Sequence, residues 1–223
     1  NGFKIAVNVL NIGRIKLGSG AVGGCKATIS TAVNYSKERK QFGTSLSTFG
    51  AIKHKIAEMV TQTFASESAH YRAGQNIDDA YDALIASGME AGKARLKSLE
   101  EYAIECAILK VHGSEVLDFV VDEGVQIYGG MGFSAEGPMD RAYRDARINR
   151  IFEGTNEINR LLTIDMLMKR AMKGTLDLMN PAMAVQKELL AIPDFGADDD
   201  TAVFAKEKKA LRNLKKAGLM AAG

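Results

Sequence analysis

One carboxylate, Glu153, stands in a sequence context that suits acid–base chemistry. It follows the apolar residues Ile151 and Phe152 and precedes Gly154 and Thr155. An apolar environment would desolvate this carboxylate, raise its pKa and make it a better base near neutral pH. Gly154 leaves room for a ligand, and Thr155 can cap a following helix, whose N-terminal amides favour an anion or a carbonyl dipole. A surface glutamate ahead of a capped helix is the alternative, and the residue types alone favour it.

A glycine-rich segment, Gln126–Phe133, is a second candidate for ligand binding. Gly129, Gly130 and Gly132 allow a backbone to approach a ligand closely. Such a loop at a helix end can hold a phosphate-bearing cofactor, although it lacks the strand and lysine of a P-loop. A glycine cap followed by a turn explains the pattern equally well.

Two further groups carry side chains suited to phosphate or amide contacts. The segment Glu38–Gly43 contains Arg39, whose planar guanidinium suits a pyrophosphate. Asn11 and Arg14 lie one helical turn apart, where the amide can bond another amide and the guanidinium a phosphate or an acidic group. Compensation of a helix dipole is the favoured explanation of the basic segment, and scattered surface polarity is the alternative for the pair. The histidines show no ligand spacing, so no metal site is expected.

Long helices are expected to carry these residues. The 223-residue chain is 46% hydrophobic, 25% charged and 7% aromatic, with three prolines, and this composition favours helix over sheet. Apolar stripes of helical period predict helices over residues 3–35, 47–75 and 92–128, and a fourth from about residue 155. Short links between such helices predict an all-α fold, an antiparallel bundle with a four-helix up-and-down core.

Several interruptions of these helices are also expected. Gly43 indicates a helix stop, Asn76–Asp79 a short polar junction, and Met131–Ile151 an irregular segment. Four glycines in the first helix indicate either a break or close helix contact: Gly18, Gly20, Gly23 and Gly24. Apolar residues of the fourth helix are expected to face inward: Ile158, Leu161, Leu162 and Met166.

Charge and cysteine content exclude some classes of protein. A net charge of +2 gives no strong attraction to nucleic acid. Cys25 and Cys106 form neither a disulfide framework nor a metal pattern, so a reducing, intracellular setting is the simplest interpretation. No apolar run of membrane-spanning length occurs, so no membrane span is expected. The first residue is not methionine, which indicates a fragment of a longer protein.

The chain changes in character beyond Gly174. A weakly structured joint is marked by Pro181, Pro193, Gly196 and Asp198–Asp200. The tail that follows carries basic residues: Lys206, Lys208, Lys209, Arg212, Lys215 and Lys216. Two interpretations are open, a basic helix that docks on a membrane or partner surface and a solvated helix, of which the second is favoured.

Four blocks of sequence together resemble the acyl-CoA dehydrogenase family. Glu38–Gly43 resembles the Arg-x-x-Phe-Gly signature of that family, and Gln126–Phe133 is similar to its Gln-x-x-Gly-Gly-x-Gly motif. Arg144–Asp145 and Phe152–Thr155 resemble the Arg-Asp and Glu-Gly-Thr elements that follow. No single block is specific to the family, but the presence of all four in this order is.

The resemblance also implies a domain organisation. It covers residues 1–173, which would form the C-terminal helical domain of the family, and residues 174–223 would begin a C-terminal extension. The opening segments, Asn1–Lys4 and Leu10–Arg14, are most similar to the very-long-chain branch. The family's N-terminal helical domain and middle β-domain would lie outside this chain, so the isolated chain is expected to be inactive and to bind FAD poorly.

The implied reaction is α,β-desaturation of a fatty acyl-CoA to the trans-2-enoyl-CoA, with FAD as cofactor and electron-transfer flavoprotein as electron acceptor. Glu153 would remove the pro-R α-proton while a hydride leaves Cβ for the flavin. Removal of so weakly acidic a proton needs a positioned base and a polarised carbonyl. The thioester carbonyl would bond the Glu153 amide and a flavin ribityl hydroxyl. Some branches place the base on the first helix, but Gly13 lies near that place and cannot serve, which favours Glu153.

The resemblance implies three sets of contacts. The FAD of a neighbouring subunit would meet Arg39, Gln41, Phe42, Gln126, Gly129 and Gly130. The FAD of the same subunit would touch Thr155, Asn156 and Glu157. Acyl-CoA would contact Asn11, Arg14, Phe152 and Gly154. The first two of these would hold the pantetheine or adenine end of CoA, and because the family often has Asp where Asn11 stands, that contact is expected to be weaker or differently polarised.

Assembly and location follow from the same resemblance. Contacts across subunits imply a homodimer or homotetramer, in the cytoplasm of a bacterium or the mitochondrion of a eukaryote. A non-enzymatic helical scaffold or assembly protein of the same family is the alternative function. Retention of Glu153 favours the enzyme.

Overall fold

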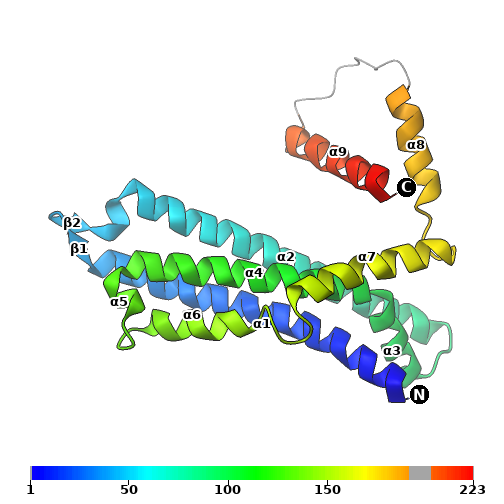
Figure 1. Ribbon diagram of the computed structural model, residues 1–223, viewed down its shortest axis with the longest axis horizontal. Helices are drawn as coiled ribbons and strands as arrows, with labels where there is room; N and C mark the ends of the chain where they lie inside the picture. Colours follow the sequence, from blue (N-terminus) through cyan, green and yellow to red (C-terminus); the bar gives the residue numbers. More distant parts are fainter. Residues whose placement is uncertain (1, 191–201, 223) are drawn as a thin grey trace. The chain divides into compact units, whose positions relative to one another are not determined.

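A computed structural model describes residues 2–190 and 202–222 (Figure 1). These residues form helices joined by short links, apart from one small hairpin. They divide into two compact units, Asn1–Ile164 and Asp165–Gly223. The expected all-α fold is therefore confirmed for the described part of the chain.

Four helices form the core of the first unit, and successive ones run in alternating directions (Figure 1): α1 (Gly2–Glu38), α2 (Gly50–Ala86), α4 (Ala103–Tyr128) and α6 (Pro138–Ile148). Shorter elements join them: β1 (Lys40–Gln41), β2 (Thr44–Ser45), η1 (Leu46–Thr48), α3 (Ala91–Glu101) and α5 (Gly130–Phe133). A loop leads from α6 to α7 (Asn156–Met172). The expected up-and-down bundle is confirmed, but its fourth helix is α6 and not the expected helix that begins near residue 155.

The central helix of the bundle is α4, which is buried around much of its circumference. Val116, Val120 and Val121 pack in the main core with Cys25 of α1 and Met59 of α2. A helix that is apolar on most sides is stable only when other helices surround it. The burial of α4 between α1 and α2 is therefore what its sequence requires.

Two of the four glycines of α1, Gly18 and Gly24, permit close helix contact, a Cβ atom on Gly20 or Gly23 would meet nothing within 4 Å, and none of the four breaks the helix. A Cβ atom on Gly113 of α4 would lie 3.0 Å from Cα of Gly18, and one on Gly24 would lie 3.0 Å from Cδ1 of Leu117. Because side chains at these positions would separate the helices, glycine allows the backbones of α1 and α4 to approach closely. Of the two expected alternatives, close contact is correct, and α1 is continuous.

Two expected interruptions near α2 are wrong. The polar segment Asn76–Asp79 lies inside α2, because Ile77 is buried against Leu99 and Cys106 and this tertiary packing outweighs the weak helix propensity of its neighbours. Gly43 does not stop a helix, since α1 already ends at Glu38. Gly43 instead has a φ of 81° in the turn between β1 and β2.

Two further expectations along the chain need correction. The predicted helix over residues 92–128 is two helices, because the backbone at Tyr102 leaves helical geometry between α3 and α4. The segment Met131–Ile151 is not irregular throughout, since it contains α6. Pro138 opens α6, where its missing amide costs no helical hydrogen bond, and Met139 and Ala146 are buried.

The second unit contains the end of α7 together with α8 (Met179–Leu190) and α9 (Ala205–Ala222). Pro181 lies in the first turn of α8, where a helix tolerates proline. Lys216 of α9 forms an ion pair with Glu188 of α8. The other residues expected in the joint, Pro193, Gly196 and Asp198–Asp200, lie outside the described residues. No helix among the described residues is both long and apolar enough to cross a membrane.

Candidate functional site

The loop between α6 and α7 holds Glu153 in an unusual backbone conformation. Glu153 has a φ of 59° and Gly154 a φ of 83°, so two consecutive residues occupy the left-handed region. For a residue other than glycine this conformation costs on the order of 1–3 kcal/mol and persists only when surrounding contacts hold it. The contacts of this loop therefore show how Glu153 is placed.

Side chains from two helices hold the carbonyl groups of the loop. Asn159 of α7 donates through Nδ2 to the carbonyl oxygens of Glu153, Gly154 and Thr155, at 3.4, 2.8 and 3.0 Å. Arg14 of α1 donates through Nε to the Glu153 carbonyl at 3.3 Å. The Glu153 backbone is thus fixed both from the following helix and from the bundle.

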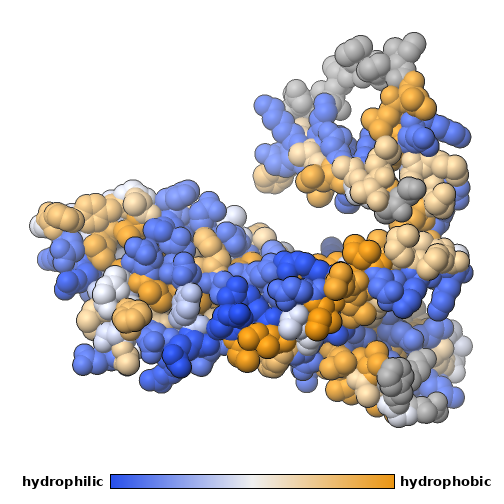
Figure 2. Space-filling view, in the orientation of Figure 1, coloured by the Kyte–Doolittle hydropathy of each residue, from blue (hydrophilic) through white to orange (hydrophobic). Residues whose placement is uncertain are grey.

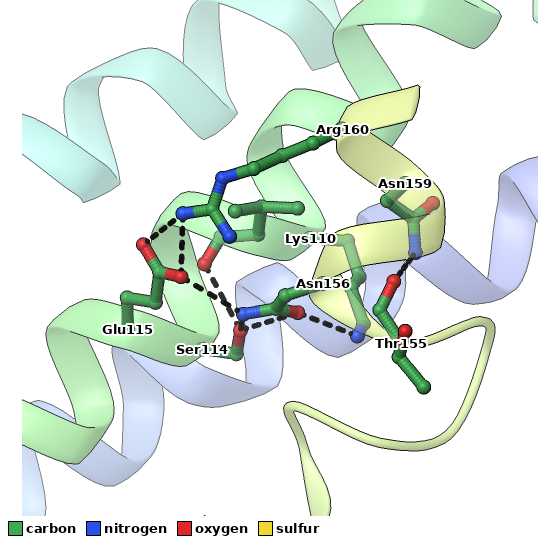
Figure 3. Close-up of polar contacts among 8 residues, drawn as sticks. Lys110, Ser114, Glu115, Thr155, Asn156, Asn159 and Arg160 are labelled. Carbon is green, nitrogen blue, oxygen red and sulfur yellow. Dashed lines mark hydrogen bonds and ion pairs between the residues drawn. The ribbon is translucent and has the colours of Figure 1, made fainter. Parts of the chain in front are cut away.

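A buried polar network connects α4 to the start of α7 and to the loop before it (Figure 3). Lys110, which is 0% exposed, donates through Nζ to Oδ1 of Asn156 at 2.7 Å, as Figure 3 shows. It also donates to the Gly154 carbonyl at 2.8 Å. Asn156 in turn donates to Oγ of Ser114 at 3.0 Å and to Oε1 of Glu115 at 3.2 Å. The start of α7 is therefore bonded to α4 through side chains that are largely buried.

This network was missed by the sequence analysis, although a signal for part of it exists. Lys110 and Ser114 are four residues apart and continue, through Leu117 and Val121, a buried stripe of α4. Two polar residues in such a stripe indicate a polar contact within the core. Nothing in the sequence identifies their partner, because Asn156 lies more than forty residues further along the chain.

The carboxylate of Glu153 faces α1. A Cβ atom on Gly13 would lie 2.6 Å from Cδ of Glu153, so the glycine provides the space that the carboxylate occupies. Glu153 also lines an open hollow of roughly 410 Å³, whose wall includes Leu17, Leu117 and Phe152. Its Oε2 atom is buried and has no hydrogen-bond partner within the described residues. A carboxylate oxygen beside an apolar hollow can accept a proton from a ligand there.

The outer surface next to this hollow is apolar. Figure 2 shows apolar side chains gathered around the loop that leads into α7. Ile148, Ile151 and Phe152 are each about half exposed. The two apolar residues before Glu153 therefore form part of an open surface and do not enclose its carboxylate.

Asn11 and Arg14 are buried, at 3% and 7% exposure. Arg14 donates through Nη1 to Oδ1 of Asn11 at 3.3 Å, and Asn11 donates to Asn8 at 3.4 Å. Burial lowers the pKa of the Arg14 guanidinium, and the nearby Glu153 opposes that effect. Scattered surface polarity is therefore the wrong interpretation of this pair, which belongs to the Glu153 site.

The first turn of α7 partly agrees with expectation. Thr155 accepts a hydrogen bond from the Ile158 amide at 3.3 Å, so the expected cap is confirmed. Hydrogen bonds from its own backbone amide and from Thr155 lower the pKa of Glu157, which is exposed. The expected inward face is wrong at Ile158 and Leu161, which are 54% and 73% exposed, while Leu162 and Met166 are half-buried. The buried face of this turn is instead polar and consists of Asn156 and Asn159, which bond to the loop and to α4.

The other expected contact residues gather at the far end of the bundle (Figure 1). The hairpin residues Arg39, Gln41 and Phe42 are exposed, as are Gln126, Gly129 and Gly130 at the end of α4. The rings of Tyr35 and Tyr128 stack with centroids 3.8 Å apart, and the Tyr35 hydroxyl donates to the Tyr128 carbonyl at 3.3 Å. This stack connects the ends of α1 and α4, so both motifs lie at one end.

This end is distant from Glu153 within the single chain. Gly13, beside Glu153, and Tyr35 are 22 residues apart on α1, which corresponds to about 33 Å of helix. The structure thus brings the candidate residues together in two separate groups, one around Glu153 and one around the hairpin.

Comparison with known proteins relates this arrangement to one family. Residues 1–168 match the model of the acyl-CoA dehydrogenase C-terminal domain. A probable acyl-CoA dehydrogenase of Bacillus subtilis is 44% identical over 222 residues, and the chain spans 37% of its length. The very long-chain specific acyl-CoA dehydrogenase of Rattus norvegicus is 40% identical over 161 residues, which are 72% of this chain and 22% of the rat protein.

A solved structure shows the same fold over nearly the whole chain. The acyl-CoA dehydrogenase of Bacillus anthracis, determined in complex with FAD, superposes with a TM-score of 0.92 at 46% identity. The match covers 99% of this chain and 37% of the Bacillus anthracis chain. Both the helical bundle and the sequence motifs therefore have one explanation: the chain belongs to the acyl-CoA dehydrogenase family, whose C-terminal domain it contains.

Proposed function

We propose that the whole protein is an FAD-dependent acyl-CoA dehydrogenase that converts a fatty acyl-CoA to the trans-2-enoyl-CoA, with Glu153 as the base. The observation that carries this proposal is the Glu153 carboxylate, which lines an apolar hollow and has one buried oxygen without a hydrogen-bond partner in the described chain. An acyl chain suits such a hollow, and a positioned carboxylate suits removal of a proton next to a thioester.

The chain's own residues account for proton removal. The Glu153 carboxylate, which lines the hollow, takes the α-proton, while Gly13 leaves the space in which the carboxylate stands. The Glu153 amide would donate to the thioester carbonyl and stabilise the negative charge that develops there. The left-handed backbone at Glu153 and Gly154 fixes the relative direction of this amide and the carboxylate. Phe152 and Gly154 would border the acyl thioester. Asn11 and Arg14, expected to hold the pantetheine or adenine end of CoA, are buried and bond each other and the Glu153 carbonyl, so their proposed part is to hold the loop that faces CoA.

The residues at the hairpin end fit the chemistry of FAD. Arg39, Gln41 and Gln126 are exposed donors for a diphosphate, and a Cβ atom on Gly129 or Gly130 would meet nothing within 4 Å, so their backbone is open to a ligand. These residues, with Phe42, would hold the FAD of a neighbouring subunit. When bound, FAD supplies the acceptor for the hydride from Cβ.

Residues that begin α7 would hold the FAD bound in their own subunit. The Thr155 hydroxyl and the exposed Glu157 carboxylate can bond hydroxyl groups. Asn156 is 2% exposed, and its amide already bonds Lys110 and Ser114, so its contribution would be to hold the first turn of α7 in place.

The proposed domain organisation, partners, oligomeric state and location follow from membership of the family. Residues 1–173 would be the C-terminal helical domain and residues 174–223 the start of an extension, in which the basic helix α9 is proposed to be solvated, with peripheral membrane contact as the alternative. Electron-transfer flavoprotein would accept the electrons, and a homodimer or homotetramer would complete the FAD site. The acyl chain-length preference is left open, and turnover across a series of saturated acyl-CoAs from C4 to C20 would measure it. The protein would act in the cytoplasm of a bacterium or the mitochondrion of a eukaryote.

The test of the base uses Glu153→Gln in the full-length protein. Turnover should fall by about 10²–10⁴-fold, the usual contribution of a general base, while FAD stays bound. Glu136→Gln, at an exposed position between α5 and α6, is the matched control and should keep wild-type turnover. Undiminished turnover in Glu153→Gln would contradict the role of Glu153. A wild-type protein whose flavin absorbance is not bleached by any acyl-CoA of the series would indicate the scaffold instead.

A further inference from the structure

We infer that Lys110 is a positioning residue for the base, and that its buried ammonium group keeps the Glu153 loop in its left-handed conformation. This inference rests on the proposed role of Glu153. It adds a residue on α4, outside the loop, on which the placement of the carboxylate depends.

The surroundings of Lys110 are unusual for a lysine. Its side chain is 0% exposed, and the acceptors it bonds are uncharged oxygens of Gly154 and Asn156. No carboxylate forms an ion pair with it among the described residues, and Nη2 of Arg160 donates to both oxygens of the nearby Glu115, at 2.7 and 2.8 Å. Burial, and next the charge of Arg14, lower the pKa of Lys110, and the carboxylates of Glu157, Glu115 and Glu153 partly oppose this without pairing with it.

A buried charge without a charged partner is costly, and an apolar residue of similar volume would serve packing better. The position of the ammonium group indicates which part of the structure this unfavourable burial stabilises. The group bonds the carbonyl of the residue that directly follows the base and the side chain of the first residue of α7. It therefore fixes both the turn at Gly154, next to the strained backbone of Glu153, and the start of the helix that the turn leads into.

Lys110 differs from Asn159, which bonds the same carbonyl. Asn159 belongs to α7 and would move together with the loop that precedes that helix. Lys110 and Arg14 belong to α4 and α1, the two helices of the bundle core that the loop covers. Among the described contacts, these two bonds connect the carbonyls of Glu153 and Gly154 to the bundle itself. Removal of one of them should let the loop relax away from α1.

A small displacement of the base is enough to slow the reaction. Misplacement of a reacting group by about 1 Å can reduce a rate by roughly 10²-fold. Because Lys110 does not line the hollow beside Glu153, its loss should affect the rate of proton removal more than the binding of acyl-CoA. The expected signature is a fall in kcat with little change in KM.

The experiment compares variants in the full-length, FAD-loaded enzyme. Lys110→Met keeps the approximate volume and removes the donors, whereas Lys110→Gln keeps a shorter, neutral donor. Lys55→Met is the control, because Lys55 is a partly buried lysine that pairs with Glu123, which lies 13 residues or about 20 Å from Lys110 along α4. The measurements are kcat and KM per bound FAD, on the best substrate of a C4–C20 acyl-CoA series, and amide hydrogen exchange over residues 150–159.

Lys110→Met should lower kcat per bound FAD by about 10–100-fold, leave KM nearly unchanged and speed amide exchange in the loop. Lys110→Gln should show smaller changes in the same direction, and it carries the test if Lys110→Met does not fold. Lys55→Met should leave all three quantities at wild-type values. Wild-type kcat and wild-type exchange in Lys110→Gln would overturn the inference.

The same set of variants separates this inference from the proposed function. If Glu153→Gln abolishes turnover but the Lys110 variants are unaffected, the positioning role fails and the base remains. If Glu153→Gln keeps full turnover, the proposed function fails first, and the effect of Lys110 on loop exchange then reports a structural contact only.

Discussion

Gly13 of α1 lies directly against the carboxylate of Glu153, although the two residues are 140 positions apart in the sequence. A Cβ atom at residue 13 would lie 2.6 Å from both Cδ and Oε1 of Glu153 and 2.7 Å from Oε2. Glycine inside a helix costs about 1 kcal/mol relative to alanine. At this position the missing side chain lets the carboxylate sit against α1, so the helix is weakened at a place where the site needs space.

The substitution Gly13→Ala should separate stability from activity. The new methyl group would meet the flexible end of the Glu153 side chain, so the carboxylate should move and the backbone should not. Relief of the glycine cost should raise the free energy of unfolding by up to about 1 kcal/mol. Turnover of the full-length enzyme should fall by about 10–100-fold, because the displaced base no longer meets the α-proton. Urea denaturation and steady-state kinetics measure the two effects.

Gly23→Ala is the control for this prediction, because Gly23 is an exposed residue of the same helix and a Cβ atom there would meet nothing within 4 Å. It should gain similar stability and keep full turnover. Equal activity in both alanine variants would show that Gly13 does not govern the position of Glu153.

Phe42 should matter for the cofactor and little for folding. Its ring is 94% exposed, and its aromatic neighbour within the chain is Phe49, edge-on at 6.3 Å. Phe42→Ala should therefore change the free energy of unfolding by less than about 0.5 kcal/mol, as exposed substitutions usually do. The same change should reduce the FAD content of the purified full-length protein, as judged from the ratio of flavin to protein absorbance.

Phe204→Ala provides a matched comparison, because Phe204 is 68% exposed and, like Phe42, has a positive φ. It lies in the second unit, away from the hairpin motif in the sequence, and should leave the FAD content unchanged. Full FAD retention in Phe42→Ala would contradict the proposed contact of this ring with a neighbouring subunit's cofactor.

His70 should make the fold less stable in acid. Its Nδ1 lies 2.7 Å from the Ser66 carbonyl, and its buried Nε2 has no partner among the described residues. Burial, together with the nearby His112, lowers the pKa of His70 below its ordinary value of about 6.5. The unfolded chain therefore binds a proton at a higher pH than the folded one, so this contribution to stability is present above about pH 6.5 and is lost as the pH falls below it.

The measurement for His70 is the urea midpoint at about pH 7.5 and pH 5.5 in the wild type and in His70→Gln. The wild type should lose more stability over this interval than His70→Gln, whereas substitution of the exposed His54 by Gln should leave the loss unchanged. An identical loss in the wild type and His70→Gln would mean that His70 does not take up a proton on unfolding in this range.

Much of the fold follows from local patterns. Helical stripes predict α1, α2 and α4 because apolar residues that recur every three or four positions must face a core. The N-terminus of α7 was predicted from Thr155, because a side chain that caps a helix acts on amides only a few residues away. The polar residues around Ile77 were misleading, since the packing of Ile77 on Leu99 and Cys106 lies far along the chain.

Only part of the site can be predicted from local sequence patterns. Four motifs identify Glu153 and the hairpin residues by type and order. Lys110 was not identified, because its partners, the Gly154 carbonyl and the Asn156 side chain, become neighbours only when α4 packs beneath the loop. No special role was expected for Asn159, yet it bonds three carbonyls of the loop in which Glu153 and Gly154 turn left-handed.

The sequence by itself determined that this chain is a helical bundle, that it belongs to one family, and that Glu153 is the candidate base. These properties depend on residue types and on short spacings, which a linear chain already contains. Only the tertiary structure decided that Gly13 makes space for the Glu153 carboxylate and that Lys110 bonds the loop that carries Glu153. Those relationships depend on distances between helices, and such distances are set by the packing of side chains that lie far apart in the sequence.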